Sequence, residues 1–300
     1  MRKFSNIVTF DWSGANQERP SGLAMAHTAS DYDAPTLMQP GKGWSRLSVR
    51  DWLLDHAKAE TDMIIAFDLS PALPFSDRGA YFDGLSDTPP DARALWALVD
   101  QTCDSDPYLA ANSFLSDDRF RPYFRVQNYD RDAKKWTVET GARFGIGAGR
   151  MRVVERQCTA QGLGNSASCL NAVGAAQVAK SSLTGMRLLH QLGGAIPVWP
   201  FDPAPARGPL IIEIYTTIAA RAAGIGAGRS KIRDGDSLDI ALANLDTRAH
   251  KPLAAYTDHA TDAILTTAWL REAVKKPENW QPEQLTTEIA RTEGWTFGVA

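Results

Sequence analysis

The stretch MIIAFDLSPALPF, residues 63–75, decides the fold. Its first five residues are all apolar, which is typical of a strand buried on both faces of a sheet. The run ends at Asp68, and the prolines that follow force a loop. We therefore expect a central strand over 63–67 that presents a carboxylate at its carboxyl end.

Similar segments lie on both sides of this stretch. FSNIVTF at 4–10 and PLIIEIYTT at 209–217 each predict a strand of the same core, and GLAMAHT at 22–28 predicts another. Helices are predicted from Ser48, with Val49, Trp52, Leu53 and Ala57 on one face, and over 171–192, 217–223, 234–246 and 257–276. Because strands alternate with helices, we expect a layered α/β fold.

The middle of the chain differs from its two ends. Residues 76–208 carry many Asp, Pro and aromatic residues and few clean repeats. We expect one domain of 300 residues whose core comes from 1–75 and 209–300, with 76–208 as an insertion or lobe.

Composition excludes several classes of protein. The formal net charge of −3 gives no bulk attraction to nucleic acid or membrane. The N-terminus lacks the apolar stretch of a signal peptide, and no window approaches the length of a membrane span. Cys103, Cys158 and Cys169 have no metal-like spacing and are expected to be reduced structural thiols. We expect a cytoplasmic protein without a membrane partner; the oligomeric state stays open.

One segment is locally basic. Residues 119–156 contain only four acids, against ten cationic side chains: Arg119, Arg121, Arg125, Arg131, Lys134, Lys135, Arg143, Arg150, Arg152 and Arg156. Such an excess in a slightly acidic protein predicts a surface that binds the backbone of nucleic acid. The glycine-rich segment 224–233, with Arg229, Lys231 and Arg233, is either a phosphate contact or a solvated basic loop.

Carboxylates stand where a fold would present them for chemistry. Asp11 follows the first predicted strand, Asp68 follows the strand 63–67, and Glu213 lies within a third strand. Asp258 and Asp262 are four residues apart on one helix face. Two carboxylates about 4 Å apart repel by roughly 4 kcal/mol at an effective dielectric near 20, so a cluster of acids must bind cations, share a proton or admit water.

Oxygen ligands of this kind suit Mg²⁺ or Mn²⁺, and two such ions can clamp the attacking and leaving oxygens of phosphoryl transfer. The alternative is structural, because acids are common at strand ends, and Asp258 can stabilise a helix N-terminus. His259, beside Asp258, either assists a metal site or is an ordinary surface histidine. Spacing alone does not decide whether the acids converge.

Several motifs, in order along the chain, together resemble one family. They are FDWSGA at 10–15, IAFDLSPALPF at 65–75, AKSSLTGMRLLHQL at 179–192 with PVWPFD at 197–202, LIIEIYTT at 210–217, HATDAILTTAWL at 259–270 and EGWTFGV at 293–299. The chain resembles the predicted RNase H-like nucleases known as domain of unknown function 429. The resemblance spans nearly the whole chain.

This resemblance implies a ribonuclease H-like mixed sheet flanked by helices, with divalent metals bound by acids. By position, Asp11 is the first-strand acid and Asp68 the acid at the end of a later strand. Asp262 is the late-helix acid, with Asp258 as its neighbour, and Glu213 matches a strand acid. The resemblance therefore implies Asp11, Asp68, Asp262 and Glu213 as catalytic residues, and Asp11, Asp68, Asp258 and Asp262 as ligands of Mg²⁺ or Mn²⁺.

Three functions compete at this point. The first is a metal-dependent nuclease or phosphodiesterase. The second is an actin-like ATPase or phosphotransferase, which DWSGA after the first strand faintly suggests, although SPALP after Asp68 is not a glycine-rich turn. The third is a binding module that keeps its acids for structure. DNA, RNA and small phosphoesters all remain open as substrates.

Overall fold

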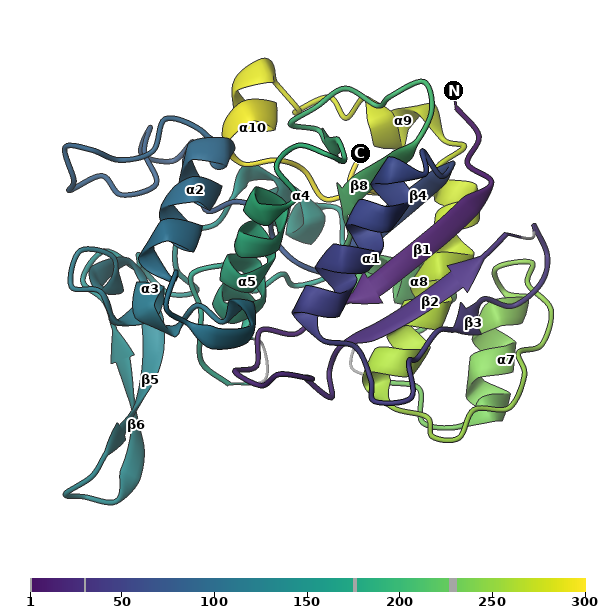
Figure 1. Ribbon diagram of the computed structural model, residues 1–300, viewed down its shortest axis with the longest axis horizontal. Coiled ribbons are helices and arrows are strands. Elements are labelled where there is room, and N and C mark those ends of the chain that lie inside the picture. The colour runs from purple at the N-terminus through teal and green to yellow at the C-terminus, as the bar shows by residue number, and fades with distance from the viewer. Residues whose placement is uncertain (1, 30, 175–176, 227–230) are drawn as a thin grey trace.

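The fold is a mixed sheet with helices on both faces. The computed structural model in Figure 1 describes residues 2–29, 31–174, 177–226 and 231–300. Six strands form the main sheet in the order β3-β2-β1-β4-β8-β7. Their bounds are Asn6–Asp11 for β1, Ala24–Thr28 for β2, Thr36–Leu37 for β3, Met63–Phe67 for β4, Val198–Trp199 for β7 and Pro209–Glu213 for β8.

The sheet has a parallel part and an antiparallel part. β1, β4, β8 and β7 run parallel to one another, whereas β2 and β3 extend the other edge in antiparallel pairs. The strands predicted at 4–10, 63–67 and 209–217 are confirmed, as is the mixed α/β class, and the structure shows that these strands are adjacent in the sheet. β7 comes from the segment 76–208, so this segment contributes an edge strand to the main sheet.

Helices cover the sheet and extend beyond it. Their bounds are Arg46–Lys58 for α1, Ala92–Thr102 for α2, Asn112–Ser116 for α3, Val153–Ala160 for α4, Val178–Gln191 for α5, Thr216–Ala222 for α6, Gly235–Ala243 for α7, Asp258–Ala273 for α8, Pro277–Trp280 for α9 and Thr287–Thr292 for α10. In Figure 1, α1 lies in front of the sheet and α8 behind it. A hairpin of β5, Arg125–Asp130, and β6, Lys135–Thr140, projects away from the body.

The two faces of the sheet bury different side chains because strand residues alternate. Phe10 and Phe67 stack on the α1 face with ring centroids 4.9 Å apart. Ile64 and Ala66 point the other way, into the cluster that includes residues of α8. The same alternation determines toward which face of the sheet Asp11 and Asp68, at the ends of β1 and β4, direct their side chains.

The predicted start of α1 was wrong by three residues. Ser45, not Ser48, is the N-cap, and the two serines exchange hydrogen bonds in a capping box. Cys103, Cys158 and Cys169 are free and buried, as expected of structural thiols. Over the described residues, every helix is too short or too polar to cross a membrane.

Candidate active site

Asp11 and Asp68 lie side by side because their strands are in register. Phe10 of β1 pairs with Phe67 of β4, and the Asp68 N–H donates to the Phe10 carbonyl at 3.0 Å. Asp11, the last residue of β1, follows Phe10, and Asp68 directly follows Phe67 at the end of β4. Since Phe10 and Phe67 face α1, alternation turns both carboxylates toward α8.

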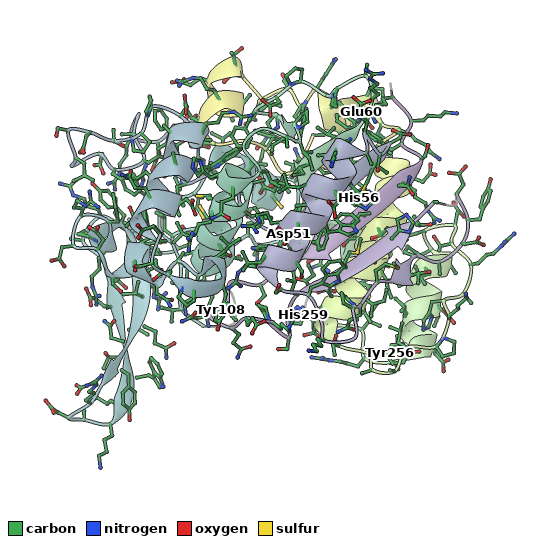
Figure 2. The ribbon with its side chains drawn as sticks, in the orientation of Figure 1. Asp51, His56, Glu60, Tyr108, Tyr256 and His259 are labelled. Atoms are coloured by element: carbon green, nitrogen blue, oxygen red, sulfur yellow. The ribbon has the colours of Figure 1, made fainter. Side chains whose placement is uncertain are left out.

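The N-terminal turn of α8 brings a histidine to this pair. His259 Nδ1 lies 3.0 Å from Asp11 Oδ2. Thr257 caps the helix through its side chain, which accepts a hydrogen bond from the Ala260 N–H. A Cβ added at Gly22 would come within 3.0 Å of His259 Nε2, so the glycine leaves room for the imidazole. Figure 2 labels His259 close to the end of the β1 arrow.

The two helix acids have cationic partners. Lys231 Nζ lies 3.2 Å from Asp262 and 3.6 Å from Asp258, and Arg233 lies 2.8 Å from Asp258. The basic segment predicted over 224–233 therefore lies against α8, although Arg229 is outside the described residues. Asp258 and Asp262 are thus ion-paired with these two side chains.

Burial and mutual repulsion raise the pKa of the acids in this cluster. Burial, followed by the charges of Asp11 and Asp262, raises the pKa of Asp68 well above its ordinary value. Burial also raises the pKa of Asp11, although the hydrogen bond from His259 opposes this change. Burial raises the pKa of Asp262 to about 6 against the opposing charge of Lys231. Each of these groups would therefore gain from a nearby cation or proton.

Glu213 has a different environment from the aspartates. It pairs with Phe67 in the sheet, so its side chain points to the opposite face from Asp68. Arg152 is 1% exposed and donates two hydrogen bonds to Glu213, at 2.5 and 2.9 Å. Thr296 Oγ1 donates a third at 2.7 Å. Glu213 is thus ion-paired and held in place by its neighbours.

A cavity of about 400 Å³ joins these groups. Asp11, Asp68, Glu213 and His259 all line it. Asp258 and Asp262 are not among its lining residues in the described part of the chain. The structure therefore brings three of the predicted catalytic acids to one cavity, while Asp262 acts on Asp68 through its charge.

Metal binding can be assessed from these contacts. Within residues 2–29, 31–174, 177–226 and 231–300, no three His, Cys, Asp or Glu side chains are arranged to hold a metal ion. Asp11 and Asp68 offer two carboxylates at one cavity, and carboxylate oxygens are the ligand type of a hard cation. Asp258 and Asp262 are bound to Lys231 and Arg233 instead.

The basic stretch 119–156 does not form one free cationic surface. Five of its cations lie within 3.2 Å of acids: Arg119 with Asp117, Arg121 with Glu139, Arg143 with Asp83, Arg150 with Asp77, and Arg152 with Glu155 and Glu213. Arg150 and Arg152 are also buried. Three of these acids, Asp117, Glu139 and Glu155, lie within or next to the stretch. The other three, Asp77, Asp83 and Glu213, come from distant segments that composition does not link to it.

Sequence reasoning missed the role of three residues at the cavity. His259 was considered beside Asp258, but its partner is Asp11, far away in the chain. Arg152 was predicted to be part of a nucleic-acid-binding surface. It is instead buried, and its guanidinium group donates to Glu213. Lys180 lines the cavity from the first turn of α5 and had no motif of its own. Only its position in AKSSLTGMRLLHQL, one of the family-like motifs, could have drawn attention to it.

Comparisons with protein-family models, curated proteins and solved structures found no match to this chain. The described geometry defines a mixed α/β protein with an acidic cavity at the carboxyl ends of β1 and β4.

Proposed function

We propose that this protein is a Mg²⁺- or Mn²⁺-dependent nuclease or phosphodiesterase of the ribonuclease H-like type. The observation that carries the proposal is the pairing of Asp11 and Asp68 at the ends of adjacent parallel strands, inside one cavity, with raised pKa values. An acid after the first strand, an acid after a later strand and acids on a late helix are what the sequence resemblance implies.

Each residue has a part in this proposal. Asp11 and Asp68 would hold the cation, and Asp262 contributes negative charge beside them. When bound, the metal would neutralise phosphate charge and lower the pKa of an attacking water. His259 holds the Asp11 carboxylate by its hydrogen bond. Glu213, ion-paired with Arg152, forms a fixed part of the cavity wall and takes no part in binding the metal in this proposal.

The test is a cleavage assay with matched variants. Labelled single- and double-stranded DNA, RNA, a hybrid duplex and ATP are incubated with Mg²⁺ or Mn²⁺. We expect metal-dependent cleavage of a phosphodiester, with a loss of about 100-fold or more in Asp11→Asn and Asp68→Asn. Asp51→Asn is the control, because Asp51 is an exposed acid on α1 (Figure 2).

Other outcomes would change the assignment. Full cleavage by Asp11→Asn would contradict the proposed mechanism. Phosphate release from ATP alone would favour an actin-like ATPase or phosphotransferase. Binding of a substrate without turnover would favour a non-catalytic binding module.

A further inference from the structure

Lys180 is a cation in the wall of the cavity that has no ionic partner among the described residues. It lines the same cavity as Asp11 and Asp68. Its ammonium group has neither an ion pair nor a hydrogen bond with any residue in the described part of the chain, and only burial lowers its pKa. Three other basic side chains near the acids already have acidic partners: His259 contacts Asp11, Arg152 contacts Glu213 and Lys231 contacts Asp262.

The backbone holds Lys180 against the turn that follows Asp11. A Cβ added at Gly14 would lie 2.3 Å from the Lys180 carbonyl carbon and 2.3 Å from the Ser181 nitrogen, so these two segments are in direct contact. Trp12 Nε1 also donates to Thr184 Oγ1 of α5 at 3.0 Å. These two contacts fix the N-terminal half of α5 over the turn that follows Asp11.

A half-buried lysine without a partner gains from an anionic ligand. Burial disfavours its charged form, and an anion that enters the cavity would offset this cost. Among the residues that the structure describes, no carboxylate supplies that anion, because none pairs with Lys180. Phosphate oxygens are suitable acceptors for an ammonium group, which donates up to three hydrogen bonds.

We propose that Lys180 binds a non-bridging oxygen of the substrate phosphate beside the Asp11–Asp68 pair, an inference that rests on the proposed function. Lys180, and not the basic stretch 119–156, would then be the main anchor for the reacting phosphate. The ligand class is a phosphodiester or another phosphate ester whose oxyanion reaches into the cavity. Gly14 is the positioning residue that allows the required close approach.

The first experiment measures binding without any need for cleavage. Wild-type protein is treated with acetic anhydride, with and without inorganic pyrophosphate or a short labelled single strand, and the modified lysines are quantified by mass spectrometry. We expect either anion to slow modification of Lys180 about tenfold while Lys58, an exposed lysine of α1, is unaffected. Equal modification of Lys180 with and without both anions would overturn the proposal.

The second experiment uses kinetics. Lys180→Gln is expected to raise KM about tenfold with a smaller change in kcat, and Lys180→Arg to recover most of the loss. Lys58→Gln is the control. A KM that responds to Lys134→Gln on the β5–β6 hairpin and not to Lys180→Gln would overturn the proposal.

The two experiments separate the two claims. Protection of Lys180 without any metal-dependent cleavage would support the phosphate site and count against the nuclease. Metal-dependent cleavage that Lys180→Gln leaves unchanged would support the nuclease and overturn the phosphate site.

Discussion

The charged form of Asp68 is disfavoured by burial and by the negative charges around it. Its carboxylate accepts a hydrogen bond from Thr216 Oγ1 at 3.3 Å and is close to the charges of Asp11 and Asp262. A protein that retains such a group at a strand end loses stability unless something compensates the charge. Functional sites often carry this kind of cost.

Asp68→Asn should therefore separate stability from activity. Without metal, we expect the variant to be more stable than wild type by about 1 kcal/mol at neutral pH, because one of the mutually repelling charges is removed. Urea unfolding in the presence of EDTA measures this difference. An Asp68→Asn protein that is less stable than wild type would show that the carboxylate has a structural role.

The pKa of Asp62 is shifted downward, whereas that of Asp68 is shifted upward, so the ionised form of Asp62 stabilises the fold. Although burial opposes it, hydrogen bonds from Ser5 and Arg2 lower the pKa of this carboxyl. Its contribution to stability is thus present above the ordinary carboxyl pKa and is lost as the pH falls through the lowered pKa. The Asp62 side chain is 38% exposed, so solvent screens the ion pair with Arg2.

We expect Asp62→Asn to lower the free energy of unfolding by about 0.5 kcal/mol near pH 7 and by almost nothing near pH 3. Urea unfolding of both proteins at the two pH values measures this. A difference that persists unchanged in acid would mean that the ionised form of Asp62 is not what stabilises the fold.

At the scale of elements, α8 packs on the sheet and places a side chain of its first turn in the cavity. Its N-terminal turn carries His259, and Thr257 is the side-chain cap. Thr257→Ala removes this cap and should destabilise the protein by about 1 kcal/mol, whereas Thr257→Ser should keep most of the stability. Thermal unfolding compares the three proteins; equal stability of Thr257→Ala and wild type would contradict the role of the cap.

Elements were predictable where the signal is local. The apolar run 63–67 and the helix at 257–276 follow from side-chain patterns within each segment, and the structure has β4 and α8 there. The start of α1 was misplaced because Ser45 and Ser48 are both good caps, and only their mutual hydrogen bonds distinguish them. The pairing of Glu213 with Arg152 joins residues far apart in sequence, which no local pattern encodes.

At the scale of the whole molecule, Arg152 links three parts of the chain. It stands just before α4 and bonds Glu213 of β8, the Glu293 carbonyl and Ser70 after β4. The segment 76–208 is therefore joined to the core by a buried ion pair as well as by β7. The strands β1 and β4 were predicted from their side-chain patterns, but neither their parallel register nor this connection was.

Arg152→Met should be severely destabilising. It leaves Glu213 and Glu155 buried without their cation, so we expect a loss of about 3–5 kcal/mol. Arg152→Met combined with Glu213→Gln should be more stable than Arg152→Met alone, because one uncompensated charge is removed. Chemical unfolding of the single and double variants measures both effects; a loss below about 1 kcal/mol for the single variant would contradict the account.

The central claim is that the Asp11–Asp68 pair binds a divalent cation. The most direct measurement is a titration of the metal-free protein with Mn²⁺. The electron paramagnetic resonance signal of the free ion reports how much Mn²⁺ stays unbound at each step. We predict saturable binding that Asp11→Asn and Asp68→Asn abolish and that Asp51→Asn retains. Absence of saturable binding by wild type, or equal binding by Asp68→Asn, would contradict the claim.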